Sequence, residues 1–187
     1  SGHDKMREPM TAGQVAENLK TFQKQALMIL DPKKTIFRHQ SEWFGKLPIG
    51  EIVKMAAPFS VNRMLERDLY ARRLSANENL SELEFLYPLF QAYDSVAMKS
   101  NVEFGGTDQE FNLLQGRRLQ KAYGQEPQDI FTTKLLVGLD GRKMSKTYAN
   151  AVNLLDSPEE KYGKIMSLRD DLIAQYFELA TEVAPVV

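Results

Sequence analysis

Residues 102–124 read VEFGGTDQEFNLLQGRRLQKAYG, and this stretch contains the pattern that decides the fold. Its first part, VEFGG, has the composition of a strand that ends in a glycine pair, and the part from FNLL onward has the period of a helix. A further strand is predicted at TTKLLVGLDG (132–141). Strands separated by a helix are typical of a parallel sheet, so the sequence predicts an α/β fold.

Most of the remaining chain is predicted to be helical. Capping-box patterns, in which Ser or Thr is followed three residues later by Gln or Glu, predict helix starts at Thr11 and Ser81. One more short strand is predicted at KTIFRHQ (34–40). Short helices are predicted over about 43–80, followed by a helical end over 157–187. Because we find no repeat and no linker, we interpret residues 1–187 as a single domain.

Composition excludes several classes of protein. The chain has 187 residues, 43% of them hydrophobic and 26% charged, which is typical of a soluble protein with a real core. A net charge of −1 means that any contact with nucleic acid must be local. The absence of cysteine and the presence of only two histidines argue against a thiolate or histidine-rich metal site. We find no run of transmembrane length and no signal peptide, so we expect a cytoplasmic protein with no membrane partner.

The loop GRKMSKTYAN (141–150) concentrates cations and hydroxyl groups in a few positions. Like charges repel, so this composition favours a strongly anionic ligand. Two lysines at i and i+3, with hydroxyl groups nearby, can contact one phosphate chain and stabilise the charge that develops on it. The alternative is a solvated surface turn. The residues concerned are Arg142, Lys143, Ser145, Lys146 and Thr147.

Polar residues also follow the predicted strand at GGTDQ (105–109). Open parallel sheets bind ligands outside the carboxyl ends of their strands, and glycine allows a ligand to approach the backbone. Asp108 is an acceptor suited to the paired hydroxyl groups of a ribose, and Gln109 can both donate and accept. The alternative is a turn with an N-capping aspartate.

A third candidate is the polar stripe of YPLFQAYD (87–94). Tyr87, Gln91 and Asp94 are spaced i, i+4 and i+7, which places them on one face of a helix. Burying them is costly unless each has a partner, so the stripe favours a polar ligand or an internal network. A half-exposed helix is the alternative.

With these three segments in view, the chain resembles the bacterial tyrosyl-tRNA synthetases, a family of class I aminoacyl-tRNA synthetases. KMSKT is similar to the KMSKS signature of that class, and YPLFQAYD and VEFGGTDQEFNLL are similar to motifs of the family. The resemblance covers nearly the whole chain, with the motifs in the family's order and spacing. It implies the C-terminal half of a Rossmann-like parallel sheet, joined to a helical connecting segment over about 43–80 that forms a homodimer interface.

The resemblance also implies the reaction and the residues that perform it. Tyrosine is activated with ATP to tyrosyl-adenylate and is then transferred to tRNA(Tyr). Mg²⁺ is expected with ATP, and no metal site made by the protein is expected. The resemblance implies that pyrophosphate is contacted by Lys143, Lys146, Thr147 and Arg7. It implies that the ribose is contacted by Gly106 and Asp108, and that the adenine is lined by Leu135 and Leu136. It also implies that the amino group and carboxylate of the tyrosine substrate are contacted by Tyr87, Gln91 and Gln109, and that its phenolic hydroxyl donates to Asp94.

The chain also departs from the family pattern. The His-Ile-Gly-His element of the family is not found in these residues, so we expect the chain to be a partial catalytic domain that is inactive in isolation. Gln40 stands where the family has an asparagine, and Thr147 replaces the final serine of the signature. Three alternatives remain open: a tryptophanyl-type synthetase, a non-catalytic dimerisation or RNA-binding module, and a generic α/β nucleotide binder. Asp94 argues for tyrosine over tryptophan, because an indole has no hydroxyl group.

Overall fold

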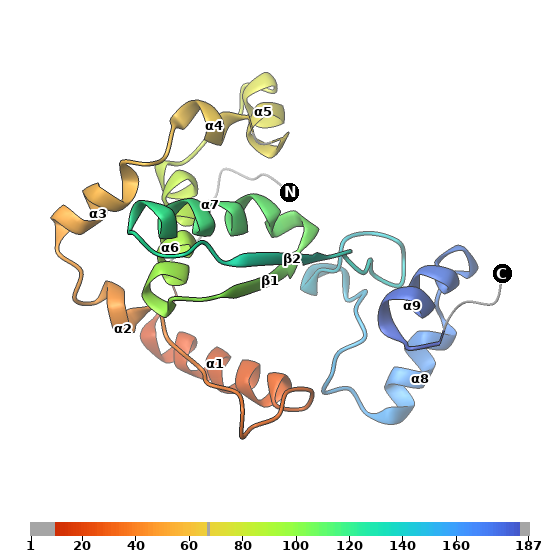
Figure 1. The fold of residues 1–187 in the computed structure, drawn as a ribbon. Coiled ribbons are helices and arrows are strands. Elements are labelled where there is room, and N and C mark those ends of the chain that lie inside the picture. The colour runs from red at the N-terminus through yellow and green to blue at the C-terminus, as the bar shows by residue number, and fades with distance from the viewer. Residues whose placement is uncertain (1–9, 67, 184–187) are drawn as a thin grey trace. The chain divides into compact units, whose positions relative to one another are not determined.

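The computed structural model describes residues 10–66 and 68–183 (Figure 1). The chain divides into two compact units. The sheet unit comprises Arg38–Thr133, and the loop unit comprises Met10–Phe37 together with the chain from Lys134 onward. The interpretation of the chain as one domain stays a prediction, because two compact units can still belong to one domain.

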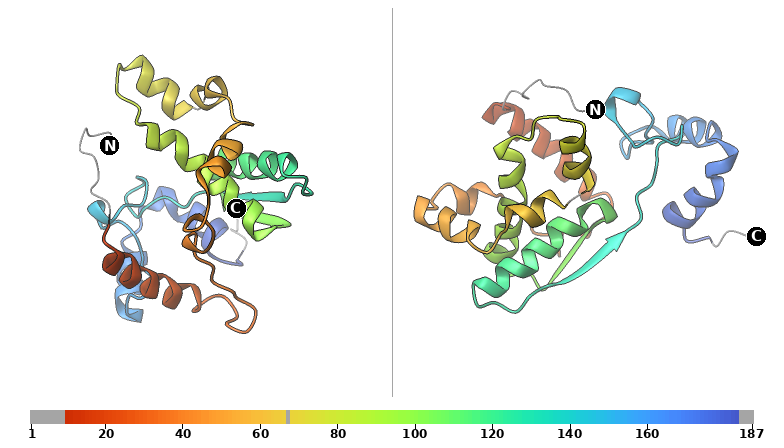
Figure 2. Two further views of the ribbon diagram at one scale, coloured as in Figure 1. Left: turned by 90° about the vertical axis from the view of Figure 1, so that its left-hand side faces the viewer. Right: turned by 90° about the horizontal axis from the view of Figure 1, so that it is seen from above.

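A parallel strand–helix–strand arrangement forms the centre of the sheet unit. Strand β1 (Val102–Gly106) pairs with β2 (Asp129–Thr133) in parallel, from Val102 opposite Asp129 to Gly106 opposite Thr133. Between them lie the 3₁₀ turn η1 (Thr107–Gln109) and helix α7 (Glu110–Ala122), and Figure 2 shows α7 running along the strands. This arrangement confirms the element order predicted from residues 102–124. The helices that precede it are α2 (Ser41–Phe44), α3 (Ile49–Ala56), α4 (Val61–Leu65), α5 (Asp68–Ser75) and α6 (Glu82–Met98).

The two faces of this small sheet differ. On one face, a Cβ atom at Gly105 would lie 3.1 Å from Cδ1 of Leu113, so the glycine allows α7 to pack closely on β1. On the other face, Phe104 and Phe131 stack on each other with their ring centroids 5.2 Å apart. Both rings are more than half exposed, so α7 covers only one side of the pair of strands.

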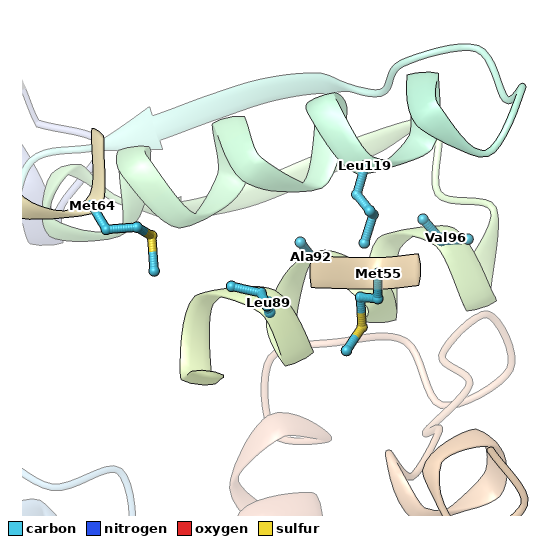
Figure 3. Close-up of a cluster of buried hydrophobic side chains, with 6 residues drawn as sticks. All are labelled: Met55, Met64, Leu89, Ala92, Val96 and Leu119. Carbon is cyan, nitrogen blue, oxygen red and sulfur yellow. The ribbon is translucent and has the colours of Figure 1, made fainter. Parts of the chain in front are cut away.

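The hydrophobic core of the sheet unit lies where α3, α6 and α7 meet. Figure 3 shows its buried side chains, which come from these helices and from α4. Burial of each large side chain contributes about 1.5–3 kcal/mol relative to exposure, so the apolar face of α6 is firmly anchored. The cluster consists of Met55, Met64, Leu89, Ala92, Val96 and Leu119.

A buried polar network fixes α6 against β1 and α7. The Ser95 hydroxyl donates to a Glu103 carboxylate oxygen at 3.0 Å, and the Gln128 side-chain amide donates to the same oxygen. Gln120 donates to the Ser95 carbonyl at 3.3 Å and accepts from the Gln128 backbone at 2.8 Å. At Gly116 a Cβ atom would lie 2.6 Å from the Ser95 hydroxyl oxygen, so only glycine leaves room for the network.

The loop unit contains helices and irregular segments. Capping boxes at Thr11 and Ser157 open α1 and α8, and the first of these was predicted from the sequence. The Tyr176 hydroxyl donates to the Val137 carbonyl at 2.7 Å and so ties α9 to the chain before the signature loop. The elements are α1 (Ala12–Ala26), η2 (Lys146–Tyr148), α8 (Pro158–Met166), η3 (Asp170–Leu172) and α9 (Ile173–Ala180).

The predicted strand at 34–40 is wrong. Residues 35–39 have no regular secondary structure, because their backbone groups bond locally. Thr35 donates its backbone N–H to the Asp31 carbonyl at 3.0 Å, and His39 donates to the Glu42 carboxylate at 2.8 Å. A strand needs these donors for its ladder, and here turns have taken them.

The predicted strand at 132–141 is also wrong over most of its length. β2 begins earlier, at Asp129, and ends at Thr133. Thr133 pairs with Gly106, the last residue of β1, so the chain beyond it has no partner strand. Beyond it, the one ladder contact in this segment is an isolated antiparallel bridge between Val137 and Lys143.

Among the residues that the structure describes, no helix is both long and apolar enough to cross a membrane.

Candidate functional site

The polar stripe of α6 lines a pocket in the sheet unit. Tyr87, Gln91 and Asp94 share this pocket, as their helical spacing predicted, and Gln40 and Phe90 complete the lining. Its volume is about 180 Å³. Sites for drug-sized ligands have volumes of roughly 300–1,000 Å³, so this pocket suits a smaller guest such as one amino acid.

The carboxylate of Asp94 is held in place by donors from the α2 region. Gln40 Nε2 lies 3.1 Å from Asp94 Oδ1 and 3.0 Å from Oδ2, and Trp43 Nε1 donates to Oδ1 at 2.9 Å. A carboxylate offers about four lone-pair positions, so Asp94 retains capacity to accept a hydrogen bond from a guest. The pocket therefore presents an oriented acceptor.

The electrostatics of Asp94 combine opposing effects. Partial burial raises the pKa of Asp94 above its ordinary value, because desolvation disfavours the charged form. The hydrogen bonds from Gln40 and Trp43 lower the pKa again, and the negative charge of Glu103 raises it. A carboxylate that gives up hydration and is held by two donors is a strong acceptor for a hydroxyl group.

Sequence reasoning assigned no site role to Gln40, Trp43 or Phe90. Gln40 was noticed only as a departure from the family pattern, yet its amide contacts both oxygens of Asp94. Gln40 and Trp43 are three residues apart at the start of α2, so an amide and an indole N–H lie on one side of a helical turn. That pairing of donors is the signal that the sequence offered.

The second predicted cluster lies at the carboxyl end of β1, as expected for a parallel sheet. Gly106 ends the strand, and Asp108 is exposed in η1, directly before α7. The side chain of Gln109 is partly buried, and its oxygen accepts from Asn112 Nδ2 at 3.0 Å. The arrangement leaves the Gln109 amide nitrogen to act as a donor.

The signature loop (141–150) belongs to the loop unit. The side chains of Lys143 and Thr147 are exposed, whereas Lys146 begins η2 and its side chain is not described. Leu135, which is 44% exposed, and the partly buried Leu136 lie in the irregular segment after β2. Arg7 lies outside the described residues. A pocket of about 440 Å³ borders the loop and is lined by Met144, Ser145, Ala149, Ala151, Asn153 and Lys164.

Arg142 has a structural environment in this loop. Its guanidinium nitrogens donate to Asp140 Oδ2 at 2.6 and 2.8 Å, and the guanidinium also lies 3.9 Å from the ring centroid of Tyr148. Hydrogen bonds from Asn150 and Arg142 lower the pKa of Asp140 to about 2. Asp140 therefore stays ionised at neutral pH and neutralises one of the loop's positive charges.

Residues 10–66 and 68–183 contain no cluster of acidic, histidine or cysteine side chains that could bind a metal ion. Within these ranges, no three His, Cys, Asp or Glu side chains gather in a way that could hold a cation. The two clusters at α6 and β1 offer hydrogen-bonding groups, and the signature loop offers cations.

Comparison with known proteins gives a consistent family. The family model described as class I tRNA synthetases (W and Y) matches residues 1–187. The tyrosine–tRNA ligase of Ralstonia nicotianae is 52% identical over 180 residues, which cover 96% of this chain and 46% of that protein. That of Thermotoga maritima is 49% identical over 184 residues, which cover 98% of this chain and 46% of that protein. The chain thus spans about half the length of the curated relatives it matches.

Solved structures agree with the fold. Tyrosyl-tRNA synthetase from Archaeoglobus fulgidus, complexed with L-tyrosine, has a TM-score of 0.70 and 27% identity, covering 87% of this chain and 51% of that one. Tryptophanyl-tRNA synthetase from Campylobacter jejuni has a TM-score of 0.59 at 22% identity over 88% of this chain and 55% of that one, and it supports the fold alone.

The predicted fold class, part of a Rossmann-like α/β sheet with helical segments, is confirmed by these structures. The strand–helix–strand arrangement, the oriented acceptor on α6 and the KMSKT loop all occur on a chain whose whole length matches one family model. The chain therefore belongs to the class I tRNA synthetases of the tryptophan and tyrosine group.

Proposed function

We propose that this chain is the part of a tyrosine–tRNA ligase that selects tyrosine and stabilises the pyrophosphate of ATP. The observation that carries the proposal is the pocket on α6, in which Asp94 presents a carboxylate held by Gln40 and Trp43. The names of the curated relatives support it, since the two relatives that are 52% and 49% identical to this chain are tyrosine–tRNA ligases.

Selection of tyrosine follows from the chemistry of Asp94. The phenolic hydroxyl donates to the carboxylate, while Tyr87, Gln91 and Gln109 contact the amino group and carboxylate of the substrate. Phenylalanine would leave Asp94 buried without its partner, and a site built for a hydroxyl group rejects such an analogue by about 10⁴–10⁵-fold. An indole brings one N–H donor and a larger ring to a pocket of about 180 Å³, which favours tyrosine over tryptophan.

The second part of the proposal concerns ATP. An oxygen of the tyrosine carboxylate attacks the α-phosphorus, the bond from that phosphorus to the bridging oxygen breaks, and the electron pair leaves with pyrophosphate. Lys143, Lys146 and Thr147 stabilise the charge that develops on the leaving group. No general base is needed, because the carboxylate is already a nucleophile, and positioning supplies much of the rate.

Other residues have supporting roles in the same proposal. Gly106 and Asp108 hold the ribose, Leu135 and Leu136 line the adenine, and Arg7 contacts pyrophosphate. Mg²⁺ arrives with ATP and reduces the charge on its phosphates.

The finer assignments of partner and location also belong to this proposal. The tyrosyl group is transferred from the adenylate to a hydroxyl group of tRNA(Tyr) in the cytoplasm, and AMP is released. The enzyme acts as a homodimer through the segment 43–80. Ile49, Val53 and Val61 of that segment are 81%, 67% and 63% exposed, which suits a surface covered by a second copy.

Amino-acid-dependent exchange of pyrophosphate into ATP tests the proposal in the complete gene product. Tyrosine should support exchange, and phenylalanine and tryptophan should fail at the same concentration. Charging of purified tRNA(Tyr) should follow the same specificity. Exchange that depends on tryptophan, or no exchange with any amino acid, would overturn the proposal. The chain of 187 residues assayed alone should show no exchange.

A further inference from the structure

Asn150 is a buried polar residue at the end of the signature loop and lines neither of the two pockets. It is 5% exposed. Among the described residues of the loop unit, it is the only buried polar side chain. A buried amide is costly unless its hydrogen-bonding groups are satisfied, so its partners indicate why it is there.

The partners of Asn150 lie before and within the KMSKT segment (143–147). Its Nδ2 donates to Asp140 Oδ1 at 2.8 Å and to the Lys143 carbonyl at 3.3 Å. Its Oδ1 accepts from the Ser145 backbone N–H at 3.0 Å, and its own carbonyl accepts from Leu139 N–H at 2.9 Å. The side chain therefore fixes the backbone immediately before and after Met144.

The geometry requires an amide rather than a carboxylate at this position. Two of the neighbouring groups, the Asp140 carboxylate and the Lys143 carbonyl, only accept, and the third, Ser145 N–H, only donates. An amide satisfies all three in one orientation only. A carboxylate would place oxygen against oxygen at Asp140.

The surrounding chain is shaped to admit this side chain. At Gly138 a Cβ atom would lie 2.2 Å from Asn150 Nδ2, so any larger residue would displace the amide. Asp140 is oriented in turn by Arg142, whose backbone N–H donates to its Oδ1 at 3.0 Å. Arg169 Nη1 donates to the Asp140 carbonyl at 3.2 Å and so ties the start of the loop to the segment before η3.

We propose that Asn150 is a positioning residue that holds the signature loop in the shape that presents Lys143 to an anionic ligand. The amide fixes the backbone at Lys143 and Ser145, whereas the side chains of Lys143 and Thr147 remain exposed. This inference rests on the proposed function for the identity of the anion, the pyrophosphate of ATP. Its structural part, that Asn150 orders the loop, can be tested independently.

The first test is kinetic and uses the complete gene product. Asn150→Ala should lower kcat/KM for ATP in pyrophosphate exchange by about 10–100-fold, because a displacement of the order of 1 Å can cost about 10²-fold. KM for tyrosine should stay within about 2-fold, because the effects of substitutions at sites that share no partners are usually independent. Asn18→Ala is the matched control: Asn18 is exposed in α1, donates to Met10 Sδ and lines neither pocket, so its loss should leave both constants unchanged.

The second test reads the loop directly. Limited trypsin digestion, followed by mass spectrometry, reports cleavage after Arg142, Lys143 and Lys146. Asn150→Ala should accelerate cleavage at these sites relative to the unmodified protein and to Asn18→Ala. Unchanged cleavage together with an unchanged KM for ATP would overturn the proposal. Cleavage that accelerates along the whole chain would also overturn it, because Asn150 would then hold the fold rather than the loop.

A pair of exchanges tests which bond matters. Asn150→Asp alone should behave like Asn150→Ala, because its new oxygen faces Asp140. Combining it with Asp140→Asn re-forms a hydrogen bond between the two positions in the opposite direction and should restore part of the loop's resistance to trypsin. If the double variant is cleaved as fast as Asn150→Asp, the bond between positions 140 and 150 is not what orders the loop. If no amino acid supports exchange in the unmodified protein, the proposed function fails while the proteolysis result still stands.

Discussion

The sheet unit and the loop unit hold their functional residues by different means. In the sheet unit, buried hydrophobic residues from α3, α4, α6 and α7 form a core, and the pocket lies on the polar side of α6. Among the described residues of the loop unit, Tyr176 is the only buried hydrophobic side chain, and the amide of Asn150 holds the signature loop. A pocket on a packed helix suits selection of one shape, and a loop held by polar contacts suits a ligand that changes charge during reaction.

The largest expected effect separates the α6 pocket from the signature loop by substrate. Asp94→Ala removes the proposed acceptor for the phenolic hydroxyl and leaves Gln40 and Trp43 without their partner. We expect kcat/KM for tyrosine to fall by about 10³-fold or more in pyrophosphate exchange, since a site built around a hydroxyl group loses most of its discrimination without the polar partner. KM for ATP should change little.

Glu82→Gln is the control for Asp94→Ala, because Glu82 is an exposed carboxylate in the first turn of the same helix. It should leave both substrates unaffected. Equal losses for tyrosine and ATP in Asp94→Ala would contradict the assignment of the pocket to the amino acid.

A smaller effect is expected in the loop unit, where a substitution should impair the reaction with ATP and leave tyrosine binding unchanged. Lys143→Ala removes a cation from the signature loop and should lower kcat for adenylate formation by about 10²-fold, as loss of one group that stabilises transition-state charge does elsewhere. Binding of tyrosine, measured by equilibrium dialysis without ATP, should be unchanged. Lys20→Ala in α1, whose side chain is 76% exposed, is the matched control for loss of one charge. Weakened tyrosine binding in Lys143→Ala would contradict the proposal that the α6 pocket binds tyrosine independently of the signature loop.

The predictability of the two units from sequence differs for a physical reason. Helical spacing placed Tyr87, Gln91 and Asp94 in one pocket, because a helix fixes which side chains share a face. Gln40 reached the same pocket from 54 positions away in the sequence, and no local pattern reports such a contact. The sequence shows this amide and the indole of Trp43 on one helical turn, but it does not show the acceptor that both contact.

The errors in strand prediction have a related cause. A strand requires a partner, and composition does not report whether one exists. The segment 34–40 has the composition of a strand, but its donors are used by turns at Asp31 and Glu42. The same holds for Asn150: it ends the loop 141–150, and only the structure shows that its amide contacts the backbone of Lys143 and Ser145.

A third effect sharpens the role of the donors that hold Asp94. Gln40→Leu removes the amide that contacts both carboxylate oxygens, and we expect KM for tyrosine to rise by about 10-fold, since a hydrogen bond to a charged group contributes about 1.5–3 kcal/mol. The pKa of Asp94 should also rise, because its charged form loses a donor. As the pH falls through this pKa, the carboxyl becomes protonated and accepts the phenolic hydroxyl less well.

The pH dependence of KM for tyrosine provides the measurement. The ordinary pKa of an aspartate is about 4. Because burial raises the pKa of Asp94 above this value, KM should begin to rise at a higher pH than an ordinary aspartate would cause. In Gln40→Leu the rise should begin at a still higher pH, and in Asp94→Asn it should be absent. Identical pH profiles for the unmodified protein and Asp94→Asn would show that another group controls tyrosine binding in acid.

The smallest effect compares the packing of the two units through one helical glycine in each. Gly116→Ala in α7 would place a Cβ atom 2.6 Å from the Ser95 hydroxyl oxygen and 2.7 Å from Gln128 Nε2. Both groups are buried and bonded to Glu103, so they cannot move without breaking the network. Overpacking of this kind costs about 1–3 kcal/mol in the free energy of unfolding, which outweighs the gain in helix propensity.

Gly163→Ala in α8 is the counterpart, because its new Cβ atom would meet nothing within 4 Å. It should raise the free energy of unfolding by up to about 1 kcal/mol, the difference in helix propensity between alanine and glycine. Urea unfolding followed by circular dichroism measures both variants. Opposite signs would show that α7 is fixed by a filled, bonded interior while this face of α8 has room for change. Stabilisation by both substitutions would mean that the network beneath α6 yields readily, and the rigid support of the pocket would then need another source.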